Sequence, residues 1–484
     1  MLKKGLIWDF VGKLFNQGIT FFVSIFLARL LLPEDFALIA MVMGFIGIAR
    51  IFVDFGLSQA LIQSQNTTDI HYSSIFWLNL FFAIFISILF FLSAPSIAFF
   101  YHQPDIINLA KVLSITFAIG ALGSVHIAML KKKMDFKYLS ITNIISATLS
   151  GCIGIYMAFN NYGVWSIVVQ QISAAAIRLF LLWYGTRWLP LFKFSWSAIK
   201  PLWNFSKKLF ISGLLETVAQ QLDVFIIGKL FMPATLGFYS RGKSLNQLIA
   251  NYSASSLSSV LFPALSKIQN NLAEVKQKVI AFFRLATLTS FFLGGLLFII
   301  AEDLIVLMFT EKWLPTVPYF RIMVLTTFAY PVSVILLTPL TSLGRSDIFL
   351  KLEIIKKIIL VPTYIIGFQF GLTGFLYAQL ISHIIGISLN GYYTGKLIHW
   401  KLSKQWVELL TYGLPAYLGA GLLFIYLPQS SIQNHFLHLL ISGIIFTIYY
   451  TIFNLLFKTT GMQLILNLVQ TFYKKMRLKN KKNL

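Results

Sequence analysis

Long apolar runs separated by short polar loops recur along almost the whole chain. Many of these runs hold about 20 residues or more, enough for an α-helix to cross the roughly 30 Å hydrocarbon core of a bilayer. The pattern predicts an all-α polytopic membrane protein with about 14 transmembrane helices. The first six are expected at residues 6–31, 36–61, 73–99, 106–130, 138–159 and 162–183. The rest are expected at residues 206–231, 236–262, 279–301, 316–343, 349–368, 372–398, 406–427 and 434–457.

Charge distribution predicts the orientation of these helices. The chain carries 39 Lys and Arg against 16 Asp and Glu, and cytoplasmic loops of membrane proteins are the ones enriched in cations. Cations gather in the loops at 131–137, 187–208, 267–278, 345–351, 396–404 and 474–482. The intervening loops at 33–35, 95–105, 160–161, 232–235, 302–312 and 428–435 are nearly free of them. Both termini are therefore expected in the cytoplasm. No segment outside the membrane is long enough for a basic nucleic-acid-binding domain.

Two stretches about two hundred residues apart repeat one pattern and indicate an internal duplication. Arg29 and Pro33 flank an apolar triplet, and Lys229 and Pro233 do the same in the second stretch. Because each half would contain an even number of spans, the halves would be parallel repeats facing a central cleft. The predicted divisions are two pseudo-symmetric six-helix bundles at residues 1–184 and 206–400, an amphipathic cytoplasmic linker at 185–205, two additional transmembrane helices at 401–457 and a basic tail at 458–484.

Polar residues inside the predicted spans form stripes. Such residues are costly in lipid, so they should mark the cleft and not the lipid face. Lys13 and Gln17 share one face of the first helix, and Lys243 and Gln247 share one face of the eighth. The candidate substrate-binding residues are Lys13, Gln17, Arg50, Arg178, Arg241, Lys243, Gln247 and Asn251. The candidates for holding a coupling ion or balancing charge are Asp54, Glu216, Gln220 and Asp223.

This mixture of side chains suits an anionic, sugar-bearing ligand. Guanidinium and ammonium groups bind phosphate oxygens, whereas amides and hydroxyls exchange hydrogen bonds with sugar hydroxyls. Arg50 and Asp54 lie one turn apart, so we expect them to form an ion pair, which is either a structural lock within the helix or a substrate contact.

Several motifs resemble those of a known family. Residues 27–38 (LARLLLPEDFAL) and 52–63 (FVDFGLSQALIQ) resemble the N-terminal signature of bacterial oligosaccharide flippases, the Wzx-type branch of the multidrug, oligosaccharidyl-lipid and polysaccharide exporter superfamily. Residues 237–242 (GFYSRG), 311–315 (EKWLP) and 343–347 (LGRSD) strengthen the resemblance, which covers nearly the full chain. Of the candidate cations, only Arg241 lies inside such a motif.

The resemblance implies an exporter of the bacterial inner membrane. It would move an undecaprenyl-pyrophosphate-linked oligosaccharide repeat unit from the cytoplasmic to the periplasmic leaflet by alternating access, for cell-surface polysaccharide or lipopolysaccharide biosynthesis. Membrane lipids and polysaccharide polymerase or assembly proteins are the partners it implies. Its cationic cleft would map onto Arg241, with Lys13 or Arg178 added by the stripe argument.

Two other functions stay open at this stage. A drug antiporter of the same superfamily would need an acidic, aromatic cleft, whereas these stripes hold more cations than carboxylates. A membrane-embedded polysaccharide polymerase or ligase would need a sizeable outer loop with catalytic groups, and the predicted outer loops are short. The sequence has no Gly-rich phosphate loop and no Cys/His cluster, so we expect no cofactor, no metal and no enzymatic activity.

Overall fold

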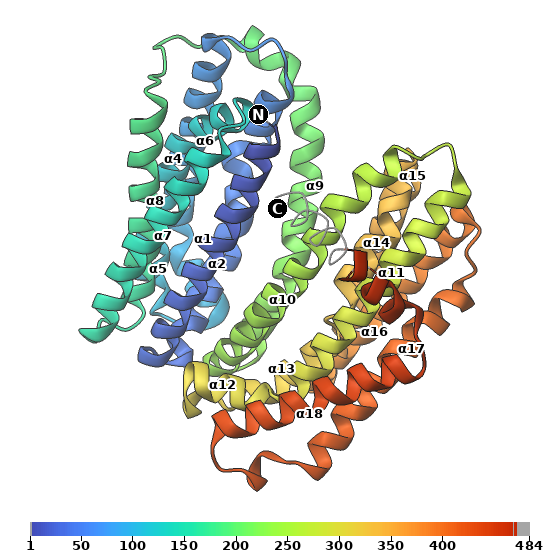
Figure 1. Cartoon of the computed structure of the whole chain (residues 1–484). Coiled ribbons are helices and arrows are strands. Elements are labelled where there is room, and N and C mark those ends of the chain that lie inside the picture. Colours follow the sequence, from blue (N-terminus) through green and yellow to red (C-terminus); the bar gives the residue numbers. More distant parts are fainter. Residues whose placement is uncertain (1, 468, 472–484) are drawn as a thin grey trace, which may run out of the picture. The chain divides into compact units, whose positions relative to one another are not determined.

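The computed structural model describes residues 2–467 and 469–471, without the side chains of residues 2–7, 9, 204–205, 208, 249–260, 346 and 430. Over this range the chain is helical and contains no strand, which confirms the predicted all-α class (Figure 1). The first helices are α1 (Leu2–Leu30), α2 (Pro33–Asp54), α3 (Leu57–Gln63), α4 (Asp69–Tyr101), α5 (Ile106–Leu113), α6 (Ile115–Lys132), α7 (Phe136–Phe159), α8 (Trp165–Thr186) and α9 (Trp196–Leu230).

The chain then continues through α10 (Pro233–Ser266), α11 (Leu272–Ile299), α12 (Ala301–Phe309), η1 (Glu311–Trp313), α13 (Thr316–Val324), α14 (Ala329–Ser342), α15 (Ser346–Gln369), α16 (Gly371–Ile398), α17 (Leu402–Tyr426), η2 (Gln429–Ser431) and α18 (His435–Leu456). Two compact units result, residues 1–240 and residues 241–484, each with its own packing. By packing, α9 belongs to the first unit, because it contacts α2, α3 and α4. The predicted boundaries of the repeated bundles stay a prediction.

Twelve helices of the described chain are long and apolar enough to cross a membrane. The predicted spans at 236–262 and 349–368 coincide with α10 and α15, which are helical but are not among these twelve. The number of 14 spans therefore stays a prediction. The chain is nevertheless a multi-pass membrane protein. Large apolar side chains such as Leu92 and Phe99 are 68% and 78% exposed, as expected where lipid is the surrounding solvent.

Small residues let the helices of the first unit approach closely. A Cβ placed on Gly151 of α7 would lie 2.4 Å from a methyl group of Val23 on α1, so only glycine fits there. Close backbone approach through glycine is a common way for membrane helices to pack, because lipid supplies no hydrophobic drive for their association. The contact fixes α1 against α7, which in turn packs against α8.

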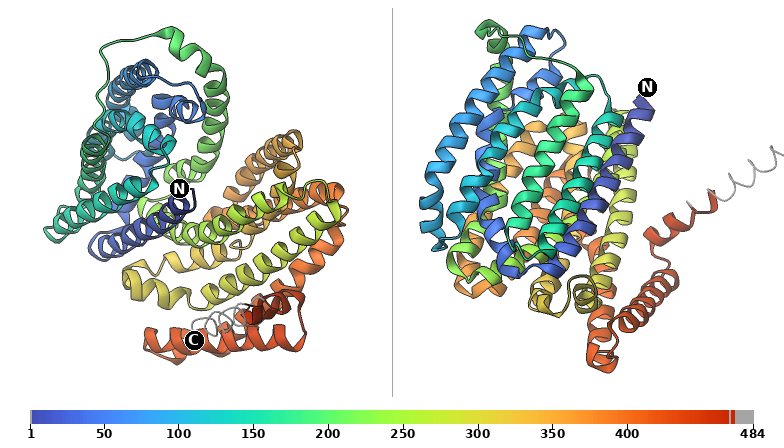
Figure 2. Two further views of the ribbon diagram at one scale, coloured as in Figure 1. Left: turned by 45° about the horizontal axis from the view of Figure 1, so that its top comes forward. Right: turned by 90° about the vertical axis from the view of Figure 1, so that its left-hand side faces the viewer.

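The predicted linker between α8 and α9 is anchored to α4. The indole N–H of Trp77 donates to the carbonyl of Leu191 at 2.8 Å, and the hydroxyls of Ser73 and Ser74 accept from the backbone N–H groups of Leu191 and Ser195, both at 2.9 Å. Figure 2 (left) shows this segment crossing one end of the first unit. The crossing chain therefore forms part of the first unit.

The second unit packs around aromatic side chains from α11, α17 and α18. Phe283, Tyr412 and Phe446 are fully buried there. A Cβ on Gly295 would lie 2.5 Å from the ring of Phe446, so glycine again permits the approach. Arg284 of α11 and Glu408 of α17 add an ion pair at 2.5 Å. The additional helices α17 and α18 are therefore integral to this unit.

Candidate functional site: a cationic cavity in the first unit

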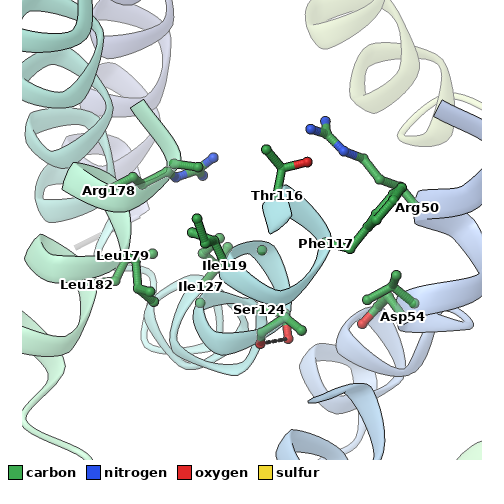
Figure 3. Close-up of a pocket in the computed structure, with 15 residues that line it drawn as sticks. Arg50, Asp54, Thr116, Phe117, Ile119, Ser124, Ile127, Arg178, Leu179 and Leu182 are labelled. Carbon is green, nitrogen blue, oxygen red and sulfur yellow. Dashed lines mark hydrogen bonds between the residues drawn. The ribbon is translucent and has the colours of Figure 1, made fainter. Parts of the chain in front are cut away.

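A cavity of about 320 Å³ lies between α2, α6 and α8 of the first unit (Figure 3). Three of the predicted site residues, Arg50, Asp54 and Arg178, line it. The remaining lining residues are Val53, Thr116, Phe117, Ile119, Gly120, Ala121, Gly123, Ser124, Ile127, Ala175, Leu179 and Leu182. The fold therefore brings together charged side chains from two helices that are far apart in the sequence.

Small residues on α6 create the space. Gly120, Ala121, Gly123 and Ser124 follow one another within little more than one turn of this helix. A Cβ on Gly120 would have no atom within 4 Å, whereas one on Gly123 would lie 3.3 Å from Leu182 of α8. Gly120 thus opens the cavity, and Gly123 lets α8 pack beside it.

The two arginines extend into this cavity from opposite sides. In Figure 3 the guanidinium groups of Arg50 on α2 and Arg178 on α8 face the region around Thr116. Within the described part of the chain, neither arginine forms a salt bridge, and the buried Nε of Arg178 has no hydrogen-bond acceptor. Guanidinium groups bind phosphate and carboxylate oxygens through paired N–H donors. These donors are therefore available to an anionic ligand.

The expected ion pair between Arg50 and Asp54 is wrong, because the carboxylate of Asp54 is used elsewhere. α2 ends at Asp54, and Phe55 and Gly56 follow with φ of 48° and 76°, which turns the chain into α3. Asp54 Oδ1 accepts hydrogen bonds from the backbone N–H of Ser58 at 3.2 Å and from its hydroxyl at 2.5 Å. Asn79 Nδ2 donates to the same oxygen at 3.0 Å. Asp54 therefore binds the first turn of α3 through Ser58 and connects it to α4 through Asn79.

Electrostatically, the cavity favours an anion. Its lining holds two guanidinium groups, those of Arg50 and Arg178, and one carboxylate, that of Asp54. The negative charge of Asp54 is already stabilised by three hydrogen-bond donors. The hydroxyl of Thr116 donates to the carbonyl of Leu113, at the end of α5, at 2.6 Å, and the hydroxyl of Ser124 donates to the carbonyl of Ala121 on α6 at 2.9 Å. A lone pair on each oxygen can still accept. The arrangement can bind a phosphate group and neighbouring hydroxyls.

Other predicted residues of the first unit lie away from this cavity. Gln220 donates to Glu216 at 2.9 Å along α9. Asp223 is buried and accepts from the hydroxyl of Tyr239 at 2.5 Å, which links α9 to the start of α10. On α1, Lys13 is exposed and Gln17 is half-buried. The proposed roles of these residues in substrate or ion binding stay predictions.

In the second unit, Arg241 is only 7% exposed. Its guanidinium lies 5.1 Å from the ring centre of Phe309 and 5.4 Å from that of Trp313, as in cation–π contacts. Lys243 is half-buried and Gln247 is exposed, whereas the side chain of Asn251 lies outside the described residues. A role for these four in substrate binding stays a prediction.

Sequence reasoning missed the residues of α6 and α4 that complete the site. Asn79 is fully buried and donates to Ser124 at 3.2 Å as well as to Asp54. A buried amide within a long apolar helix is a usable signal, since such groups are costly in lipid. Thr116, Gly120 and Ser124 give no comparable signal, because small residues are common wherever membrane helices pack.

A second pocket, of about 760 Å³, lies on another face of α2. It is lined almost entirely by apolar side chains of α2, α4 and α9, among them Phe45, Phe52 and Phe225. The rings of Phe90 in this pocket and Phe117 in the cationic cavity meet edge to face at 5.4 Å. α2 and this ring pair therefore separate a charged space from an apolar one.

The fold and the cavity define a multi-pass helical membrane protein with an internal cavity lined by two arginines and one aspartate. The family model for polysaccharide biosynthesis proteins matches residues 26–318, more than half of the chain. The chain therefore belongs to the polysaccharide biosynthesis protein family, and its resemblance to Wzx-type flippases is confirmed. It is a membrane transporter of polysaccharide biosynthesis.

Individual relatives agree with this assignment. The chain is 22% identical over 393 residues to the lipopolysaccharide biosynthesis protein WzxC of Escherichia coli (strain K12), covering 79% of each chain. It is 23% identical over 306 residues to the succinoglycan biosynthesis transport protein ExoT of Rhizobium meliloti (strain 1021), covering 63% of this chain and 62% of that one. Its fold resembles the lipid II flippase MurJ in an inward closed conformation, with a TM-score of 0.76 and 14% identity over 93% of this chain and 98% of MurJ.

Proposed function

We propose that this protein is a flippase for a lipid-linked oligosaccharide repeat unit. The substrate is carried on undecaprenyl pyrophosphate and moves from the cytoplasmic to the periplasmic leaflet of the bacterial inner membrane by alternating access. The product then serves polysaccharide polymerase or assembly proteins at the cell surface. The named functions of WzxC, ExoT and MurJ support the substrate class.

The observation that carries the proposal is the pair of arginines without a salt bridge in the cavity of the first unit. Placing two cations beside membrane helices is costly unless they meet an anion. A pyrophosphate offers several oxygens to two guanidinium groups, and Thr116 and Ser124 offer acceptors to sugar hydroxyls beside them. A cationic drug would instead meet repulsion from Arg50 and Arg178, which disfavours the antiporter alternative.

The position of the cavity fits loading from the cytoplasmic side. Arg50 lies one turn before the end of α2, and because α1 and α2 run in opposite directions this end is the one near the N-terminus. If the N-terminus is cytoplasmic, as the loop charges predict, the cavity lies toward the inner leaflet. A headgroup made in the cytoplasm would meet these arginines first.

The test measures transbilayer movement of a lipid-pyrophosphate oligosaccharide in proteoliposomes. We expect Arg50→Gln and Arg178→Gln each to lower the rate about 10- to 100-fold, because each removes charge-assisted hydrogen bonds worth about 1.5–3 kcal/mol. Arg178→Lys keeps the charge but lacks the paired donors of the guanidinium group. We expect its rate to lie between those of the wild type and Arg178→Gln.

The matched control is Lys193→Gln, which removes an exposed cation of the linker and should leave the rate unchanged. Full activity of both arginine variants would show that the cavity does not lie on the transport route. Efflux of a cationic dye, without movement of any glycan lipid, would favour the antiporter.

A further inference from the structure

The apolar pocket between α2, α4 and α9 extends along much of α4. Its lining on this helix runs from Ile86 to Phe100, fourteen positions apart, which corresponds to about 21 Å of helix. One leaflet contributes about half of the roughly 30 Å hydrocarbon core of a bilayer. The pocket, of about 760 Å³, is therefore long enough to hold the acyl chain of a lipid over the depth of one leaflet.

The lining of the pocket suits an apolar ligand. Of its described lining residues, all but Ser93 and Ser96 are apolar, and the hydroxyl of Ser93 donates to the carbonyl of Leu89 at 2.7 Å. Water is a poor occupant of such a space, because it finds too few polar partners there. Leu89 and Phe100 are exposed, and all three helices contribute segments that are apolar enough to cross a membrane. The pocket is therefore open to the hydrocarbon chains of the bilayer.

A lysine is held at one end of the pocket. Nζ of Lys229, in the last turn of α9, donates to the carbonyl oxygen of Phe100 at 2.6 Å. It also lies 5.2 Å from the ring centre of Phe100 and 3.0 Å from Nε2 of His102. Because Phe100 is itself a lining residue, its ring and its carbonyl fix the ammonium group of Lys229 beside the end of the pocket.

The positive charge of Lys229 is available to an anion. Within the described part of the chain this exposed residue forms no salt bridge, and a carbonyl oxygen does not cancel a full charge. An ammonium group has three donors, so one N–H remains beside the contacts with Phe100 and His102. The apolar segments of α4 and α9 end at Tyr101 and Leu230. Lys229 therefore lies where membrane spans meet water, at the level of lipid phosphates.

The position of the pocket favours a lipid of the surrounding bilayer over the transported substrate. The cationic cavity, with Arg50 and Arg178, adjoins another face of α2. A chain that ran from there into the apolar pocket would have to pass the packed, buried rings of Phe90 and Phe117. A phospholipid with its phosphate at Lys229 would enter the pocket directly.

We propose that this pocket binds one acyl chain of an anionic phospholipid whose phosphate group is held by Lys229. The chain lies along α4 from Phe100 toward Ile86, and the headgroup stays at the membrane surface. A zwitterionic phospholipid has the same chains but no net charge. The site therefore prefers phosphatidylglycerol to phosphatidylcholine.

Photocrosslinking of the full chain in phosphatidylcholine nanodiscs tests the proposal. The probe is phosphatidylglycerol with a diazirine near the end of one acyl chain, and a phosphatidylcholine probe with the same chain measures the background. Crosslinked peptides are identified by mass spectrometry. We expect crosslinks in residues 45–52 of α2 and 86–93 of α4, with a yield about fivefold higher for phosphatidylglycerol, because one cation near the headgroup contributes about this factor.

Lys229→Gln tests the headgroup contact. We expect this variant to lower the yield with phosphatidylglycerol to that with phosphatidylcholine and to leave the latter unchanged. Lys111→Gln is the matched control, because the ammonium group of Lys111 also lies 5.2 Å from a phenylalanine ring of α4, that of Phe91, which does not line the pocket. The control should behave like the wild type.

Ala49→Leu tests the chain contact, because Ala49 lines the pocket and a larger side chain fills part of it. We expect this variant to lose most of the crosslinking of both probes at these two segments. Gly421→Leu, on α17 of the second unit, should leave the crosslinking unchanged, since it adds bulk in open space outside the pocket.

Equal yields of the two probes in the wild type would overturn the proposal, as would equal effects of Lys229→Gln and Lys111→Gln. Suppression of the crosslinks by undecaprenyl phosphate at a lower concentration than by unlabelled phosphatidylglycerol would also overturn it. The pocket would then bind the isoprenoid carrier and not a bilayer phospholipid.

Discussion

At the scale of single residues, the site depends on which polar groups already have partners. Asp54 was expected to neutralise Arg50, but Ser58 and Asn79 occupy its carboxylate. Arg50 and Arg178 keep their donors for a ligand as a result. Spacing along one helix could not reveal this, because the donors to Asp54 come from a helix break and from another helix.

Gly120→Leu tests the cavity without removing a charge. A side chain at this position enters empty space, since a Cβ there has no neighbour within 4 Å. We expect the rate of glycan-lipid movement to fall at least tenfold, while stability holds or rises by up to about 1 kcal/mol because glycine is a poor helix former. Rate and thermal midpoint are measured on the same preparation.

Gly421→Leu on α17 is the matched control, because a Cβ there also has no neighbour within 4 Å and the position does not line the cavity. Equal rates in the two leucine variants would contradict a transport role for the space beside Gly120.

At the scale of elements, an ion pair that the hydropathy pattern does not reveal connects α11 and α17 of the second unit. Arg284 and Glu408 join α11 to α17 through two hydrogen bonds to one carboxylate oxygen, at 2.8 and 2.5 Å. Their side chains are only 28% and 17% exposed. Removing one partner of such a partly buried ion pair is costly, because the other charge then stays unpaired in a poorly solvated environment.

Arg284→Met should therefore destabilise the protein by about 3 kcal/mol, the lower end of the range for buried pairs. The double variant with Glu408→Gln should recover part of this loss, since no unpaired charge remains. The midpoint of denaturant unfolding in detergent measures both. Lys278→Gln is the control, because it breaks an exposed pair with Glu274 on the same helix, which is worth about 0.5 kcal/mol or less.

At the scale of the whole molecule, the predicted membrane orientation can be tested with the single cysteine. Cys152 is exposed and is first replaced by serine. New cysteines then replace Asn160, in a loop without cations, and Lys133, in a cation-rich loop; both positions are exposed. We expect a membrane-impermeant maleimide to label position 160 in intact cells and position 133 only after the membrane is opened. Labelling of position 133 in intact cells, and of position 160 only after the membrane is opened, would show that the predicted topology is inverted.

The sequence by itself determined the helical membrane class, the approximate spans and the family, because apolar length, loop charge and local motifs are properties of consecutive residues. It also predicted Arg50, Asp54 and Arg178 as candidate site residues, since charges within spans are conspicuous. Only the tertiary structure decided that these three share a cavity with α6, that the carboxylate of Asp54 binds Ser58 and Asn79, and that Arg284 pairs with Glu408. These facts depend on contacts between helices distant in sequence, which small residues permit and which leave little trace in hydropathy.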